Sequence, residues 1–366
     1  MKILLAGNRL CVCILLLSSM LIGCGSAGPD LEIGKEYPTA NEQQEANALL
    51  KTLKDGIAKM YEGKLIRRDA HPKHHACLQA EFSVSPDLPD FLQVGAFQPG
   101  KKYPAWIRYS NGSPGKADFE KNIRGMAIKL LDVEGEKLLD DEKDAKTQDF
   151  LLINHNVLVV KDGADFHSLV KALQAKSPMG FFFNPMDSHI KEFLIFLDTV
   201  KNYPNLLDVR YWSTTPYLFG EGKAVKYSAK PCTPGSSEMP EDPSADYHRQ
   251  VMSKQLAEGG GCFDFMVQLQ TDANTMLIED ARSAWDEEVS PFQKVATINI
   301  PAQKFESKAQ MDFCEDISFT PWHSLPEHRP LGDVNRTRKT VYQGISKFRH
   351  EQNKTLRQEP IGMEKF

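Results

Sequence analysis

The sequence predicts an α+β protein with an antiparallel β-barrel core and flanking and C-terminal helices. Its composition is that of an ordinary folded chain, because 41% of its 366 residues are apolar and 25% are charged. Short apolar or alternating runs broken by turns occupy residues 80–160, as expected of antiparallel strands. Apolar residues at helical spacing precede and follow that region. The net charge of -5 provides no strongly basic surface, so we expect no nucleic-acid partner.

The first segment has the features of an export signal. Lys2 and Arg9 precede an apolar run over residues 10–22, which suits a secretory signal peptide and is too short to span a bilayer comfortably. The run ends in Leu21-Ile22-Gly23-Cys24, which resembles the lipobox of bacterial lipoproteins. In those proteins the Cys thiol receives a diacylglycerol and becomes the new N-terminus after cleavage. A plain signal peptide and an uncleaved anchor are the alternatives.

This resemblance to lipoproteins implies a division of the chain. Residues 1–23 would be the signal peptide, residues 24–60 a lipidated tether with an N-terminal helix, and residues 61–366 the functional domain. Lipid on Cys24 would anchor the protein to a membrane of the bacterial cell envelope. Because Gly25 rather than Asp follows the Cys, the resemblance favours the periplasmic face of the outer membrane.

The elements of the domain follow from the spacing of apolar residues. Leu49, Leu53 and Ile57 lie at helical spacing among charged residues, which predicts one amphipathic helix over residues 41–63. Further helices are expected at 164–175, at 187–202 and, with a basic composition, at 335–352. Strands are expected at 81–84, 106–109, 125–130, 150–160, 225–228, 263–269 and 297–300. The polar stretches 132–148 and 230–246 are expected to be loops, the second of them mobile.

The cysteines leave the disulfide pattern open. Without the signal peptide and Cys24, four remain, Cys77, Cys232, Cys262 and Cys314, and an oxidising compartment permits three pairings that the sequence cannot rank. None of the four are spaced as C-x-x-C, so a zinc ribbon or a thioredoxin-like site is not supported. The sequence also lacks the phosphate-loop, dinucleotide-binding, H-E-x-x-H and G-x-S-x-G motifs.

A cluster of basic residues and histidines precedes the β region. His71, His74 and His75 could bind a metal, but Pro72 argues against a regular helix that would bring their rings together. A bland surface loop is a second alternative. The favoured interpretation pairs Arg68 with His71, so that the guanidinium grips an anionic cofactor edge while the imidazole faces the reacting centre.

One predicted strand carries polar residues on a single face. In extended backbone, Trp106, Arg108 and Ser110 share one side, and Ile107 and Tyr109 share the other. An Arg and a Ser on the same side suit a polar site inside the barrel, or else an exposed face. Periodicity alone leaves both interpretations open.

Two later features carry candidate chemistry. A largely apolar strand ends with Asn154, and a buried Asn often marks a site, although capping of the strand end is the alternative. Arg338 precedes Tyr342 by four residues on a predicted helix, so its guanidinium can lie against the phenol. A nearby cation favours phenolate, the form that ligates ferric haem, whereas the alternative is an ordinary surface contact.

Taken in order, these motifs resemble the catalase superfamily, specifically the small catalase-related haem proteins of bacteria. The resemblance covers roughly residues 61–350 and rests on the ordered series more than on any one fragment. The matching segments are Arg68-x-x-His71-x-Lys73, Ile107-Arg108-Tyr109-Ser110-Asn111-Gly112, Arg124-Gly125-Met126-Ala127-Ile128-Lys129, Asn154, Lys161-Asp162-x-x-x-Phe166, Tyr211-Trp212-Ser213-x-Thr215-Pro216-Tyr217, Glu279-Asp280 with Trp285, and residues 321–332.

The resemblance implies a catalase-like barrel, haem b as the cofactor and a role for each candidate residue. His71 would be the distal acid and base, Asn154 the second distal residue that orients peroxide, and Ser110 the partner of the His71 ring. The residues expected to hold the haem are Arg68 and Arg108 at the propionates, Phe166 against the cofactor, Tyr342 as the proximal iron ligand and Arg338 beside it.

The implied activity is dismutation of hydrogen peroxide or peroxidase-type reduction of small organic peroxides, as protection against oxidative stress. Ala70 stands where large catalases usually have Val, and this small residue would leave room for a fatty-acid hydroperoxide isomerase of the same superfamily. A haem-binding lipoprotein without turnover is the other alternative. The family is also compatible with a homo-oligomer.

Overall fold

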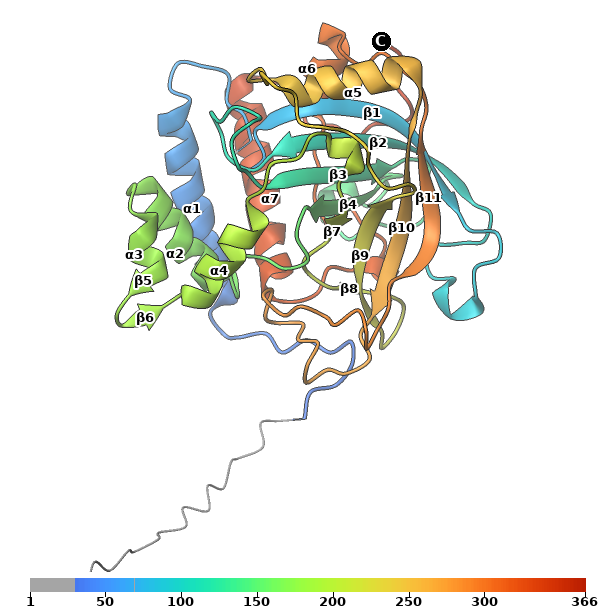
Figure 1. Cartoon of the computed structure of the whole chain (residues 1–366). Helices are drawn as coiled ribbons and strands as arrows, with labels where there is room; N and C mark the ends of the chain where they lie inside the picture. Colours follow the sequence, from blue (N-terminus) through green and yellow to red (C-terminus); the bar gives the residue numbers. More distant parts are fainter. Residues whose placement is uncertain (1–29, 69) are drawn as a thin grey trace, which may run out of the picture. The chain divides into compact units, whose positions relative to one another are not determined.

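A closed antiparallel β-barrel is the centre of the computed structural model, which describes residues 30–68 and 70–366. Eight strands follow one another in the order β1-β2-β3-β4-β7-β9-β10-β11, and β11 pairs with β1 to close the barrel (Figure 1). Their bounds are β1 Lys73–Val84, β2 Lys102–Asn111, β3 Arg124–Leu130, β4 Gln148–Ile153, β7 Tyr211–Trp212, β9 Ala224–Pro231, β10 Gly261–Leu269 and β11 Gln293–Ile300. The predicted α+β fold with an antiparallel barrel is therefore confirmed.

Three shorter strands lie outside this ring. The strand β8 (Tyr217–Leu218) pairs with β9 beyond β7, and β5 (Phe183–Asn184) and β6 (Asp187–Ser188) form a separate hairpin. The helices are α1 Glu42–Met60, α2 Gly163–Gln174, α3 Pro178–Phe182, α4 Ile190–Thr199, α5 Tyr247–Glu258, α6 Lys308–Asp316 and α7 Asp333–Asn353. Short 3-10 helices occupy Asp90–Leu92, Asp140–Glu142, Leu206–Asp208 and Pro326–His328.

Aromatic and aliphatic side chains fill the barrel. The ring of Phe265 lies 4.8 Å from that of Phe150 and 5.1 Å from that of Phe82, measured between centroids. These rings belong to one buried cluster with members from all eight barrel strands. At such distances aromatic pairs add to the stabilisation from area burial. The barrel interior is therefore a packed core.

The polar face of β2 lies on the outside of the barrel. Ile107 and Tyr109 belong to the interior cluster, whereas Trp106 packs outside it against residues that include Cys314 of α6. Arg108 shares the outer side with Trp106, because side chains alternate along a strand. The interpretation that placed this polar face inside the barrel is wrong, since apolar residues occupy the inward positions. The face is nevertheless buried, because helices cover it.

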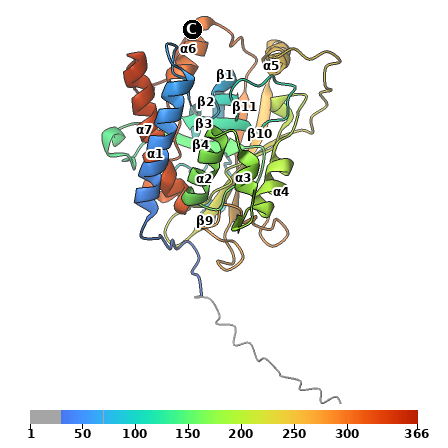
Figure 2. The same ribbon diagram turned by 90° about the vertical axis from the view of Figure 1, so that its left-hand side faces the viewer.

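Helices α1, α2 and α7 pack together on one side of the barrel. Figure 2 shows α1 between α7 and α2, with α3 and α4 beyond α2. The contact is made by an apolar stripe on each helix, with Leu49, Leu53 and Ile57 of α1 against Val341 and Ile345 of α7. This is the amphipathic pattern that predicted α1, and it is confirmed.

An ion-pair cluster ties the segment before α1 to α7. The guanidinium of Arg336 pairs with Glu42 at 2.7 Å, with Glu279 at 2.8 Å and with Glu36. Burial opposes the charge of Arg336, but the hydrogen bonds to Glu42 and Glu279 raise its pKa. Three carboxylates around one planar guanidinium fix the start of α7 more firmly than a single exposed pair could.

Some predicted elements differ from the structure. The strand expected over residues 150–160 ends at Ile153, although the Asn154 N–H still donates to the Arg124 carbonyl of β3 at 3.0 Å. The helices α5 and α6 escaped prediction, because several of their buried residues, such as His248 and Gln310, are polar. The polar loop 132–148 contains the short helix Asp140–Glu142 and buries part of its chain.

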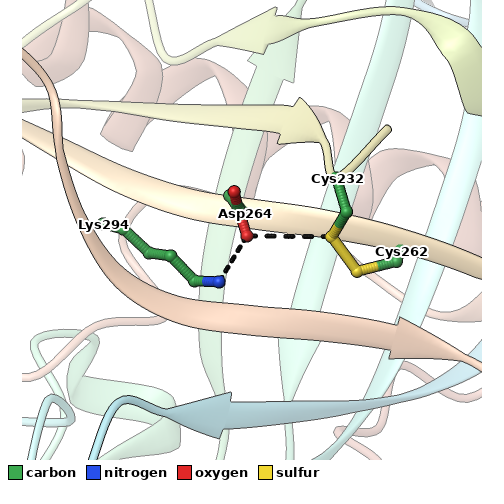
Figure 3. Close-up of a disulfide and its surroundings, with 4 residues drawn as sticks. All are labelled: Cys232, Cys262, Asp264 and Lys294. Atoms are coloured by element: carbon green, nitrogen blue, oxygen red, sulfur yellow. Dashed lines mark hydrogen bonds and ion pairs between the residues drawn. A yellow bond between two sulfur atoms is a disulfide. The ribbon is translucent and has the colours of Figure 1, made fainter. Parts of the chain in front are cut away.

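The structure selects one disulfide among the three pairings. Cys232 at the end of β9 is bonded to Cys262 at the start of β10, with 5.4 Å between their Cα atoms (Figure 3). The Asp264 carboxylate lies beside this bond and pairs with Lys294 at 2.6 Å. Cys77 and Cys314 are free thiols, both buried on the outer side of β1.

The described residues do not include the predicted export signal. The signal peptide expected over residues 1–23 and the lipidation site Cys24 both lie outside them. Within the part of the chain that the structure describes, no helix has the length and hydropathy needed to cross a membrane.

Candidate functional site

His71 lies directly before β1, where it contacts β2. Its backbone has a φ of 57°, and its N–H donates to the Gly112 carbonyl at 3.3 Å. Its ring Nδ1 lies 3.1 Å from the hydroxyl of Ser110, and Arg108 donates to the His71 carbonyl at 2.7 Å. The structure therefore brings together the predicted distal base, its predicted hydroxyl partner and one predicted propionate ligand. The left-handed backbone, uncommon for a residue with a side chain, is held by these contacts.

The ring of His71 lies against the backbone of Gly125, which pairs with Ser110 across β2 and β3. A Cβ atom at position 125 would lie 2.5 Å from Nδ1 of His71 and 2.9 Å from the hydroxyl oxygen of Ser110. Both distances are shorter than any van der Waals contact. The His71 ring can therefore occupy this position only because residue 125 has no side chain.

The His71 imidazole is neutral. Burial lowers its pKa to about 3, and the guanidiniums of Arg108 and Arg338 contribute to the shift. Arg338 comes from α7, so the electrostatic field of that helix reaches the distal side. A ring that stays unprotonated above about pH 4 can accept a proton from a substrate at any physiological pH.

Three guanidiniums, those of Arg68, Arg108 and Arg349, gather around the C-terminal end of α6. Arg68 donates to the carbonyls of Cys314 and Glu315 at 3.1 and 2.9 Å, and Arg349 donates to the Glu315 carbonyl at 2.6 Å. Burial and the charge of Arg68 lower the pKa of Arg108 to about 10, and they lower the pKa of Arg349 to about 10 as well. Mutual repulsion of this kind marks a surplus of positive charge.

The surplus charge remains after the nearby acids are counted. Burial alone would raise the pKa of Glu315, but contacts with His74 and the three guanidiniums lower it to about 2, so it is ionised. Even with Asp316 ionised as well, three cations face two anions. The Nε atoms of Arg68 and Arg108 are also buried without a hydrogen-bond partner. Orphaned donors and excess charge together fit an anionic ligand such as a haem propionate.

Arg349 is the residue that the sequence analysis missed. It lies seven residues after Tyr342 on α7, and this spacing of two helical turns places both on one face of the helix. Following the helical face that carries Arg338 and Tyr342 for two further turns would have found it. Its burial, 2% exposed, could not have been read from the sequence.

Asn154 is buried at the end of β4 with its side chain fully engaged. Its oxygen accepts from the Arg124 N–H at 2.7 Å, and its amide donates to the Thr199 carbonyl at 2.8 Å and the Tyr203 hydroxyl at 3.2 Å. Asn154 and His71 thus contact adjacent residues, Arg124 and Gly125. To orient a peroxide, Asn154 would exchange the Tyr203 hydroxyl for it.

The predicted proximal residues lie on α7 and α2. The Arg338 guanidinium is 5.8 Å from the centre of the Tyr342 ring, as their four-residue spacing predicts. Arg338 also donates to the Thr215 hydroxyl at 3.3 Å. Tyr342 and Phe166 are half-buried against the same apolar cluster between α1, α2 and α7. The structure thus gathers these three residues on the helical side of the site.

The three-histidine metal alternative is wrong. His74 and His75 are successive residues of β1 at a β-bulge, and their rings contact different partners. His74 lies 3.3 Å from Glu315, and His75 lies 2.8 Å from the Asn111 side-chain oxygen. With His71 directed at Ser110, the three rings face different partners.

Comparisons with known proteins point to one family. A family model described as catalase matches residues 32–195. Similar solved structures include a fungal catalase (18% identity, TM-score 0.64), a bacterial catalase (17%, 0.60) and catalase A from Saccharomyces cerevisiae (18%, 0.62). Each match covers 89% of this chain but 66%, 64% and 68% of the respective catalase, so the chain spans about two thirds of their length. No curated protein matches the chain.

At this low identity, the structural likeness to the solved catalases shows the fold alone. The family model matches the N-terminal half of the barrel, and His71, Arg108 and Asn154 lie within the matched residues. Both agree with the ordered motifs and with the closed eight-stranded barrel. The chain therefore has the fold of the solved catalases, and its residues 32–195 match the catalase family model.

Proposed function

We propose that the protein is a haem-dependent catalase or peroxidase that acts on hydrogen peroxide or small organic peroxides. One observation carries the proposal: the neutral His71 lies within the electrostatic reach of Arg338 on α7, and Arg108, which contacts His71, belongs to a group of arginines with unpaired donors. A base beside a cationic group of side chains with unpaired donors is what a peroxide enzyme with an anionic cofactor requires.

The side chains of this candidate site fit haem b. Tyr342 would ligate the iron through its phenolate oxygen, and Arg338 would favour that charged form. Arg68 and Arg108 would bind the propionates through their unpaired Nε donors, and Arg349 would add positive charge beside them. When bound, haem supplies a redox-active iron at which a peroxide O–O bond can be cleaved.

The chain itself supplies proton transfer and positioning. With Nδ1 held by Ser110, Nε2 of His71 accepts a proton from one peroxide oxygen and returns it to the departing oxygen. The low pKa of His71 makes it a base before the transfer and a strong acid after it. Gly125 fixes the ring by leaving room for it, and Asn154 would orient the second peroxide oxygen.

The reconstituted protein tests the assignment. Haem added to the purified chain should give a ferric phenolate spectrum, and Tyr342→Phe should abolish that spectrum. His71→Ala should bind haem with the same spectrum but should lower oxygen release from hydrogen peroxide by about 10²–10⁴-fold, the range typical for loss of a general acid-base catalyst. The matched control is His167→Ala, which removes a buried histidine of α2 that contacts Thr52 and Glu45 and should leave activity unchanged.

The outcomes separate the related functions. If the wild-type protein does not bind haem, the enzyme assignment is refuted. Haem binding with equal turnover in the wild type and His71→Ala would refute the distal site. Conversion of a fatty-acid hydroperoxide without oxygen release would indicate the isomerase, which the small and exposed Ala70 favours. Binding without any turnover would indicate a non-catalytic haem lipoprotein.

We propose further that Cys24 carries the lipid that holds the protein at the periplasmic face of the outer membrane. The lipobox-like sequence before Cys24 supports this assignment. Labelled palmitate should be incorporated into the wild type and not into Cys24→Ala, and the wild type should sediment with outer membranes. Wild-type protein that is released in soluble, unlabelled form would contradict the anchor.

A further inference from the structure

Three buried side chains converge beside the distal residues without a role in the proposed reaction. They are His75 of β1, Asp118 from the connection between β2 and β3, and His248 of α5, each at most 1% exposed. His75 Nδ1 lies 3.5 Å from the Asp118 Oδ2 atom, and His248 Nδ1 lies 3.7 Å from the same oxygen. One potential ligand atom of each residue lies within 4.8 Å of the other two.

The hydrogen-bond partners of His75 fix its tautomer. Its Nε2 lies 2.8 Å from Oδ1 of Asn111, and Arg124 donates to the same oxygen. A guanidinium can only donate, so the atom of Asn111 at this position is the carbonyl oxygen and not the amide nitrogen. Nε2 of His75 must therefore carry the proton, and in the neutral ring Nδ1 presents a lone pair toward Asp118.

The tautomer of His248 is fixed in the same way. Its Nε2 lies 3.0 Å from the carbonyl oxygen of Tyr203, which can only accept, so Nε2 carries the proton. Its Nδ1 therefore has a lone pair as well, and this atom is buried without any hydrogen-bond partner. The two imidazoles meet edge to face, with their centroids 5.0 Å apart.

The carboxylate is also oriented from behind. Its Oδ1 accepts from Lys73 at 2.7 Å and from the Asn111 amide at 3.1 Å, while Oδ2 accepts from the backbone N–H of His248 at 3.1 Å. Oδ2 keeps capacity for one more partner. Lone pairs of two imidazole nitrogens and one carboxylate oxygen thus face a common point, and none of the three groups has a proton to place there.

We propose that His75, Asp118 and His248 bind a divalent first-row transition-metal ion of the zinc class. Two imidazoles and a carboxylate are a common ligand set for such ions, and the remaining tetrahedral position would take a water molecule. Ligand atoms of a tetrahedral site at 2.0–2.1 Å from the metal lie about 3.3 Å apart, so the separations of 3.5 and 3.7 Å between the imidazole nitrogens and Asp118 Oδ2 need only a small contraction. Hydrogen bonds from the far side of each ligand, here to Asn111, Tyr203 and Lys73, are typical of metal sites.

The charged neighbours select the type of ion. Lys73 pairs with Asp118 and with Asp246 at 2.9 Å, and Arg124 donates to the carbonyls of Asp118 and Glu120. These two cations disfavour a hard ion held mainly by charge, such as calcium or magnesium, which also prefers oxygen ligands. Nitrogen ligands favour zinc and its neighbours instead.

The ion would brace the distal half of the haem site. It would join β1, the β2–β3 connection and the N-terminal end of α5, three parts of the chain that are far apart in the sequence. Of these, β1 follows His71 directly, and the β2–β3 connection begins after Ser110 and ends at Arg124 and Gly125. The role is structural and does not depend on the proposed peroxide chemistry.

Metal analysis of the full chain tests the site. We expect protein purified from zinc-supplemented cells to retain about one zinc ion per chain after dialysis against a mild chelator. Zinc-edge X-ray absorption should show two imidazoles and one carboxylate, a signal that haem iron does not affect. His248→Asn should reduce the zinc content at least about tenfold, as expected for loss of one of three protein ligands. His167→Gln, a change of a buried histidine outside the cluster, should keep the zinc.

The result that overturns the proposal is equally definite. Less than about one-tenth of an ion per chain in the wild type, after growth with zinc, cobalt, iron or manganese, would mean that the three lone pairs face a buried water molecule instead. Zinc that persists in His248→Asn, or an absorption spectrum without imidazole, would place the metal elsewhere. The spectrum is recorded on the wild type, so the test survives if the variant fails to fold.

Discussion

Substitution of Gly125 by Ala isolates the position of the His71 ring from its chemistry. The added Cβ would lie 2.5 Å from Nδ1 and 2.7 Å from Cε1 of His71, whereas carbon contacts are comfortable at about 3.5 Å. The ring must therefore move by about 1 Å, because the β3 backbone on the other side is fixed in the barrel. Gly125 has no positive φ, so Ala fits the strand backbone itself. A displacement of about 1 Å can cost about 10²-fold in rate, or about 2.7 kcal/mol of transition-state stabilisation.

The assay compares peroxide turnover with haem content in the same sample. Gly125→Ala should keep its haem spectrum. Its melting temperature should change little, because overpacking destabilises the folded protein, whereas the smaller conformational freedom of Ala in the unfolded chain stabilises it. Gly259→Ala is the matched control, because a Cβ there meets only the Gln255 carbonyl at 3.9 Å. Turnover in Gly125→Ala within about threefold of the wild type would refute the inference that the position of His71 limits the reaction.

Three further predictions concern stability and cofactor binding. Burial opposes protonation of His323, but the carboxylates of Glu359 and Asp149 raise its pKa to about 8, so folding takes up a proton. The free energy of unfolding should therefore fall by about 2 kcal/mol as the pH rises from about 6.5 through 8, and denaturant midpoints should show no such fall in a His323→Gln variant. Cys232→Ser removes the disulfide that closes a loop of 30 residues, and it should lower the free energy of unfolding by about 3–4 kcal/mol relative to the wild type. Under reducing conditions, which break the bond in the wild type as well, the two proteins should have the same free energy of unfolding. Arg349→Met should weaken haem binding at least about tenfold in a titration, and an unchanged affinity would contradict its role beside the propionates.

The regular elements were predictable because their signals are local. The alternation in β2 and β10 and the apolar stripe of α1 depend on residues within one element, and each of these elements lies where expected. The helix α5 was missed for the opposite reason. Its buried face includes His248, which is polar and acceptable there only because Asp118 and Tyr203 come from elsewhere in the chain.

The sequence predicted which residues belong to the candidate site, but not on which side of the barrel they lie. Alternation showed that Arg108 and Ser110 share a face, yet the period of two is the same for inward and outward faces. The aromatic rings of the neighbouring strands decided the matter, because they fill the barrel and leave the polar residues outside, under the helices. The sequence order also could not reveal that Arg349 joins Arg68 and Arg108.

By itself the sequence determined most of the barrel strands, the helices α1, α2, α4 and α7, the motif series that resembles catalases and the pairs that lie one turn apart, such as Arg338 and Tyr342. These depend on backbone geometry over a few residues. Only the tertiary structure decided the Cys232–Cys262 pairing and the meeting of His75 with Asp118 and His248. Such contacts require closure of the whole barrel, and no local preference encodes which distant side chains closure will bring together.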